Sequence, residues 1–179
     1  METRIGNIII SAAGGTAGTG AKTYKMSLPT AWINELGISG TDRQVKLSFD
    51  GKQIVISRKW SMDEFKQRVI DEKHSLYLIE YYNKDYLCTR ILADFTAEEL
   101  QIENFTDELI KTAFGRNDLP TWADFLEFLE ERCIPRQRAG LNEYLDALGI
   151  DEYDPFEIVK QTSGRMADDE QWIRVEEVK

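Results

Sequence analysis

Few side chains in this chain are of the types that enzymes use as nucleophiles, general bases or zinc ligands. The 179 residues include a single histidine, His74, and two cysteines, Cys88 and Cys133. Nucleophile–base pairs and zinc sites need several such residues close together. The sequence also lacks a phosphate-binding loop and the Gly-x-Ser-x-Gly and His-Glu-x-x-His patterns of hydrolases. We therefore expect no enzymatic activity, no metal site and no cofactor.

Carboxylates are numerous, and paired carboxylates can bind Mg²⁺ or transfer protons. Glu127, Glu130 and Glu131 lie largely on the polar side of an amphipathic segment, and residues 168–170 form a short acidic run. Because Asp and Glu are usually exposed to water, we interpret both groups as solvated surface.

Basic and hydroxyl side chains around residues 11–21 have a clearer chemical meaning. This stretch holds four glycines and otherwise only small side chains, which is typical of a loop. Such a loop can approach a DNA backbone closely and donate main-chain and hydroxyl hydrogen bonds to phosphates. We predict that the DNA-binding residues are Arg4, Thr16, Thr19, Lys22 and Lys25.

A second group of basic residues lies in an acidic part of the chain. Its arginines can pair with neighbouring carboxylates, or they can dock a phosphate or a protein partner. Both interpretations are open. The candidate partner-binding residues are Arg132, Arg136, Arg138, Asp168, Asp169 and Trp172.

The elements expected to position the first basic group lie between residues 22 and 59. Residues 22–28 alternate between apolar and polar side chains, which predicts a half-buried strand. Pro29 is suited to begin a short helix, and Gly37 to end it. Residues 45–49 and 53–57 alternate again around Asp50-Gly51, a strong hairpin signal.

In this order and spacing, residues 4–59 resemble the AbrB/MazE/SpoVT family of DNA-binding domains. The matching residues are Leu28-Pro29, Leu36-Gly37-Ile38, Asp42 and the Asp50-Gly51 hairpin with Ile54 and Ile56. The resemblance implies an intertwined homodimer with a swapped-hairpin, β-barrel-like fold that binds double-stranded operator DNA. Lys25 matches the basic residue that most such domains carry before Leu-Pro. Many relatives have arginines where this chain has Ile33 and Asn34.

The small size and the positive charge of the N-terminal part also favour a DNA-binding homodimer. A domain this small, with short strands and a two-turn helix, cannot bury enough apolar surface alone, which favours a homodimer. Residues 1–60 contain eight Lys or Arg and four Asp or Glu, a formal charge of +4, whereas residues 61–179 contain 14 and 28, a formal charge of −14. The chain thus combines a basic part and an acidic part with different expected partners.

The pattern of residues 60–179 predicts a second domain of α+β class. Three strand-like runs, 76–82, 86–93 and 100–105, precede helical patterns over 107–114, 121–133, a segment beginning at Pro135, and 156–162. We expect a small antiparallel sheet followed by a helical bundle. The segment from Arg132 to Leu141, together with Asp168, Asp169 and Trp172-Ile173, resembles segments associated with HipA-like kinases, which implies a toxin–antitoxin or regulatory setting.

These observations predict a sequence-specific DNA-binding transcription regulator, an antitoxin-like autoregulator that acts as a homodimer. The alternative is a protein-neutralising inhibitor, an antitoxin or a phage-encoded inhibitor of a nuclease, in which the acidic domain covers a basic partner. The possible protein partners are a toxin, a kinase or a nuclease. No apolar run approaches the ~20 residues that span a bilayer. We interpret the two cysteines as free thiols. We expect a cytoplasmic protein without a membrane partner.

Overall fold

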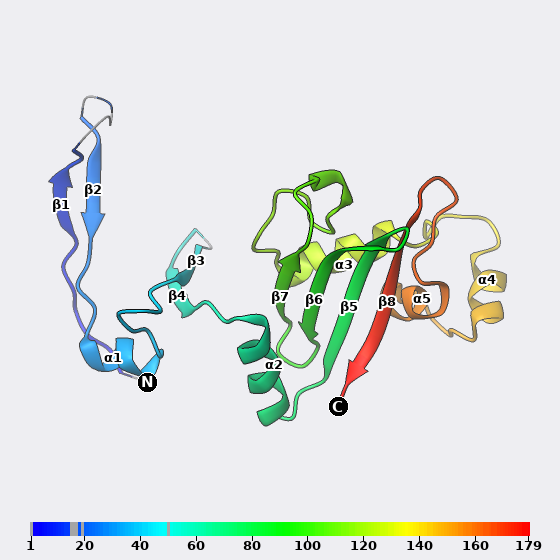
Figure 1. Cartoon of the computed structure of the whole chain (residues 1–179), viewed down its shortest axis with the longest axis horizontal. Coiled ribbons are helices and arrows are strands. Elements are labelled where there is room, and N and C mark those ends of the chain that lie inside the picture. Colours follow the sequence, from blue (N-terminus) through cyan, green and yellow to red (C-terminus); the bar gives the residue numbers. More distant parts are fainter. Residues whose placement is uncertain (1, 15–17, 19, 50) are drawn as a thin grey trace. The chain divides into compact units, whose positions relative to one another are not determined.

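The computed structural model describes residues 2–14, 18, 20–49 and 51–179 (Figure 1). Contacts divide the chain into two compact units, Met1–Lys59 (unit 1) and Trp60–Lys179 (unit 2). Both contain antiparallel strands and at least one helix, so the α+β class predicted from the sequence is confirmed.

Unit 1 consists of two hairpins and a short helix. Strands β1 (Ile9–Ala12) and β2 (Lys22–Lys25) pair antiparallel, as do β3 (Val45–Phe49) and β4 (Ile54–Arg58). Helix α1 (Thr30–Glu35) lies between the hairpins in sequence. It follows Pro29 directly, and Gly37 has the positive φ of +69° that suits a residue after a helix end.

The hairpins of unit 1 form separate two-stranded sheets, and the described residues contain no closed barrel. None of the described residues of unit 1 is buried. Two isolated hairpins have little stability in water unless their apolar faces are covered. The unit therefore has the secondary structure that the sequence predicts but no core of its own.

Unit 2 is built around one antiparallel sheet with the strand order β7-β6-β5-β8. Its strands are β5 (Leu76–Asn83), β6 (Tyr86–Asp94), β7 (Glu99–Asn104) and β8 (Gln171–Val178). Figure 1 shows the C-terminal strand, in red, lying beside β5. The first three strands fall where the sequence predicts them.

Helices cover both faces of this sheet. The main core joins one face, through Ile79 and Ile91, to α3 (Trp122–Glu131), α4 (Leu141–Leu148) and α5 (Pro155–Thr162). A smaller core on the other face packs Leu76 and Leu92 against α2 (Met62–Asp71). Unit 2 thus has the apolar interior that unit 1 lacks.

Three expectations for unit 2 are wrong in detail. The helix expected at Pro135 begins only at Leu141, because residues 135–140 form turns that end at Gly140 with a φ of +80°. The helix expected over 107–114 is a single 3-10 turn, η1 (Leu109–Lys111). The sheet is not simply followed by helices, since the last residues return to it as β8.

Helix α3 begins with a capping box. Thr121 Oγ1 accepts the N–H of Asp124, whose carboxylate accepts the N–H of Thr121 in return. We expect Thr121→Ala to lower the free energy of unfolding by about 1 kcal/mol, because it leaves an N-terminal N–H of the helix without its acceptor. Urea unfolding measures this loss. Thr121→Ser keeps the hydroxyl and should unfold like the parent; an equal loss in both variants would contradict the capping role.

No helix in the described parts of the chain combines the length and the apolar character needed to cross a bilayer.

Candidate functional site

The β3–β4 hairpin of unit 1 has one apolar and one mostly polar face. Phe49 lies directly opposite Ile54, and Leu47 lies opposite Ile56. Since cross-strand partners share a face, these four side chains form one apolar surface. Phe49 is 72% exposed and Ile54 69% exposed. No described residue of unit 1 covers Phe49 or Ile54.

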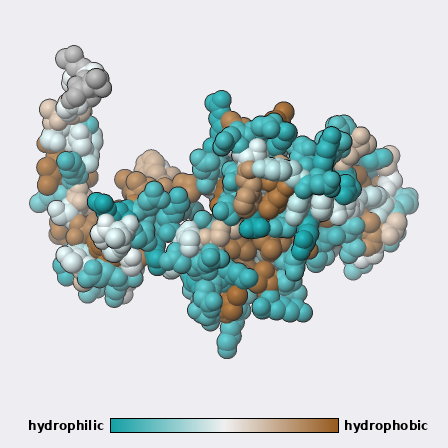
Figure 2. Space-filling view, viewed as in Figure 1, coloured by the Kyte–Doolittle hydropathy of each residue, from teal (hydrophilic) through white to brown (hydrophobic). Residues whose placement is uncertain are grey.

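The β1–β2 hairpin repeats this arrangement. Ile10 lies opposite Tyr24, and both are more than half exposed, as are their neighbours Ile8 and Met26. Figure 2 shows hydrophobic residues on the surface of this unit. We call the exposed apolar side chains of both hairpins the unit 1 apolar faces: Ile8, Ile10, Tyr24, Met26, Leu47, Phe49 and Ile54.

The predicted DNA-binding lysines lie on opposite faces of β2. Lys25 pairs with Ile9 and shares its face with Thr23, away from Tyr24. Lys22 pairs with Ala12 at the loop end of the hairpin, on the face of Tyr24. Lys25 therefore lies on the more polar face of β2, and Lys22 lies at the loop end of the apolar face.

The other predicted DNA-binding residues lie outside β2. The Arg4 guanidinium stands over the Trp32 ring of α1, 5.8 Å from its centroid, while the Trp32 indole N–H donates to Glu2. Arg4 is thus brought to α1 rather than to the lysines. Thr16 and Thr19 lie outside the described residues.

Lys46 lies on the other hairpin of unit 1 and was not among the predicted DNA-binding residues. Lys46 lies opposite Ser57, on the polar face of β3–β4. Its alternation with Val45 and Leu47 in the sequence could have placed it there.

Two of the proposed partner-binding residues in unit 2 are joined inside the fold. Arg132, at the end of α3, is buried, and its Nη2 donates to Asp169 Oδ1 at 3.1 Å and to the Gln171 carbonyl at 2.9 Å. Its Nε donates to the Gly164 carbonyl. The hydrogen bond from Arg132 lowers the pKa of Asp169 although partial burial opposes this shift. The pair ties the start of β8 to α3.

Arg136, Arg138 and Asp168 are exposed. Arg136 donates to Glu130 at 2.6 Å and stands 4.2 Å from the centroid of the Tyr153 ring. These contacts show pairing with neighbouring acidic and aromatic groups, one of the two interpretations that the sequence left open.

Trp172, by contrast, belongs to an aromatic stack at the surface of the sheet. Its ring lies nearly parallel to that of Tyr82, with centroids 4.4 Å apart, and the Arg165 guanidinium stands 5.0 Å from the centroid of the Trp172 ring. Next to Tyr82, Glu80 accepts hydrogen bonds from Tyr82 and Arg90. No local pattern in the chain indicates this stack, since Tyr82 and Trp172 are 90 positions apart.

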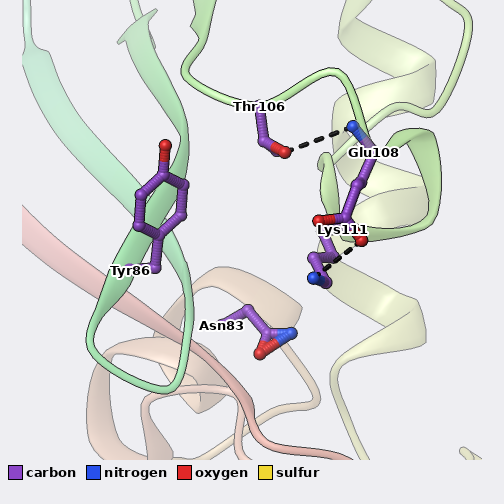
Figure 3. Close-up of a pocket in the computed structure, with 5 residues that line it drawn as sticks. All are labelled: Asn83, Tyr86, Thr106, Glu108 and Lys111. Carbon is purple, nitrogen blue, oxygen red and sulfur yellow. Dashed lines mark hydrogen bonds and ion pairs between the residues drawn. The ribbon is translucent and has the colours of Figure 1, made fainter.

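A polar pocket of about 290 Å³ opens at the β5–β6 turn (Figure 3). Tyr86 faces Glu108 and Lys111 across it, and Glu108 and Lys111 form an ion pair at 2.7 Å. Asn83 and Thr106 complete its lining. The ammonium group of Lys111 is paired with the Glu108 carboxylate, so it is not available to bind an anionic ligand.

Neither cysteine has the environment of a reactive thiol. Burial raises the pKa of Cys133 to about 12, and burial also raises the pKa of Cys88. Reactive cysteines need a lowered pKa and access to solvent, whereas both side chains are buried.

The geometry thus offers two surfaces of different character: the exposed hairpins of unit 1 with their lysines, and the aromatic and charged sheet face of unit 2. The chain matches no protein-family model, and no curated protein and no solved structure is significantly similar to it.

Proposed function

We propose that the protein is a sequence-specific DNA-binding transcription regulator, an antitoxin-like autoregulator that acts as a homodimer through unit 1. One observation carries this proposal. Unit 1 has well-formed amphipathic hairpins and a formal charge of +4 over residues 1–60, yet none of its described residues is buried. A second copy of the same surface would supply the missing core.

In the proposed dimer, the unit 1 apolar faces of two chains pack together as a swapped-hairpin, barrel-like body. This packing leaves the polar faces outside, where Lys25 lies on β2 and Lys46 on β3. Lysine and arginine at such positions neutralise DNA phosphates and release bound counterions. Contacts to base edges from the same surface would supply the sequence preference.

A salt series tests the phosphate contacts. Six contacts per dimer, from Arg4, Lys22 and Lys25, should give a log–log slope of binding constant against salt near about −5. Lys25→Ala removes two of these contacts, so its slope should be shallower by about 2. Fluorescence anisotropy with a duplex from the protein's own promoter measures both slopes.

Lys66→Ala is the matched control, because Lys66 is an exposed lysine of α2 in unit 2. It should leave the slope unchanged. Binding that does not depend on salt, or an equal change in both variants, would remove the support for DNA contact by β2.

The second candidate function is protein neutralisation by unit 2. It is favoured by the formal charge of −14 on residues 61–179, which suits a basic toxin, kinase or nuclease surface. Unit 2 has its own hydrophobic core, so a fragment of residues 60–179 is expected to fold. Capture of a partner by this fragment would support neutralisation, and capture of none would leave DNA-binding autoregulation alone.

A further inference from the structure

Three side chains that commonly bind metal ions meet where α2 ends. The Nδ1 of His74 lies 2.8 Å from Asp94 Oδ2 and 3.7 Å from Glu72 Oε2. One ligand atom from each residue lies within 4.8 Å of the other two. All three residues belong to unit 2, and no second group of this kind occurs in the part of the chain that the structure describes.

The backbone holds His74 firmly in this place. Lys73 adopts a left-handed conformation with a φ of +59°, and the N–H of His74 donates to the carbonyl of Val69 in the last turn of α2. This hydrogen bond reverses the chain at the helix end. Ser75 then donates its N–H to Thr96 Oγ1, which joins the segment to the β6–β7 turn.

Asp94 is oriented from the other side. Its side chain is fully buried, and its Oδ1 accepts the N–H groups of Thr96 and Ala97 at 2.9 and 3.0 Å. These bonds direct Oδ2 toward His74. Hydrogen bonds that fix a ligating carboxylate in this way are typical of metal sites in proteins.

We propose that Glu72, His74 and Asp94 bind one divalent transition-metal ion, with water completing the coordination. Zinc–ligand bonds of about 2.1 Å place neighbouring ligand atoms of a tetrahedron about 3.4 Å apart. The two distances from His74 Nδ1, 2.8 and 3.7 Å, lie on either side of this value. His74 and Glu72 are partly exposed, so the ion can enter from solvent.

Two properties of the surroundings favour a cation here. The carbonyl groups at the C-terminal end of α2 carry partial negative charge. One nitrogen and two carboxylates are a ligand set suited to zinc and its neighbours rather than to Mg²⁺ or Ca²⁺, which prefer oxygen. A bound ion would link the end of α2 to the turn between β6 and β7.

The test uses the full, untagged chain freed of metal and titrated with Zn²⁺. Because His74 is the only histidine, its ring signals in long-range ¹H–¹⁵N spectra report this site alone. We expect calorimetry to give one Zn²⁺ per chain, and the Nδ1 signal of His74 to shift rather than the Nε2 signal. Glu72→Gln and His74→Gln should each weaken binding by more than about tenfold, since even the loss of an outer hydrogen bond costs 10- to 100-fold.

Glu152→Gln removes an exposed carboxylate elsewhere in unit 2 and should bind Zn²⁺ like the parent. The Glu72 variant keeps the test valid even where a change at buried Asp94 disturbs folding. Unchanged His74 signals on addition of Zn²⁺ would show a hydrogen-bonded His–Asp pair only, and full affinity in His74→Gln would place the ion elsewhere. Either result overturns the proposal.

Discussion

Ile54→Asp is expected to convert the protein from a dimer to a monomer and to abolish its binding to DNA. Ile54 lies opposite Phe49 at the turn end of the apolar face of β3–β4, where the proposed partner chain would cover it. The substitution would place an unpaired carboxylate from each chain in that apolar interface. Burying such a charge costs several kcal/mol, so the dimer should dissociate at least about a hundredfold more readily.

Light scattering at several protein concentrations measures the oligomeric state, and anisotropy with the promoter duplex measures DNA binding. Ser48→Asp is the matched control, because Ser48 lies on the opposite, polar face of the same hairpin. It adds the same charge and should leave the dimer intact. An Ile54→Asp protein that remains dimeric would show that another surface joins the chains, and a parent protein that is monomeric would rule out the proposed assembly.

Arg132→Ala is expected to lower the free energy of unfolding of unit 2 by about 2 kcal/mol, because it leaves partly buried acceptors without their hydrogen-bond donor. The substitution leaves the carboxylate of Asp169 and the carbonyls of Gly164 and Gln171 without the donor they share. These three acceptors hold β8 in place beside β5. Urea unfolding followed by circular dichroism measures the change.

The loss should depend on pH in a defined direction. Because the pKa of Asp169 is lowered in the folded protein, the ion pair stabilises the fold above the pKa of an ordinary aspartate, about 3.9, and this stability disappears as the pH falls through the lowered value. The difference in unfolding free energy between parent and variant should therefore shrink in acid.

The matched control is Arg136→Ala, which removes an exposed arginine and should change stability little. An Arg132→Ala protein as stable as its parent that no longer captures a partner would instead identify Arg132 as a docking residue.

Local signals in the sequence were sufficient for most elements of secondary structure. Pro29 before α1, Gly37 after it and the alternation in β3 each depend on residues a few positions apart. Such patterns act through hydrogen bonds and side-chain directions within one turn or one strand. Of the candidate DNA-contacting lysines, Lys25 was predicted from its place before Leu28-Pro29 and Lys22 from its charge and location beside the glycine-rich loop.

Contacts between distant residues could not be read in this way. The pairing of β8 with β5, the Arg132–Asp169 ion pair and the meeting of His74 with Asp94 join residues that are 20 to 102 positions apart in the chain, and no local pattern marks them. Only tertiary packing decides which of many arginines and carboxylates become buried partners. The sequence by itself determined where most chain segments become strands and helices, because those choices depend mainly on neighbouring residues. The tertiary structure decided which faces are covered and which charged groups meet, because those depend on how the whole unit packs.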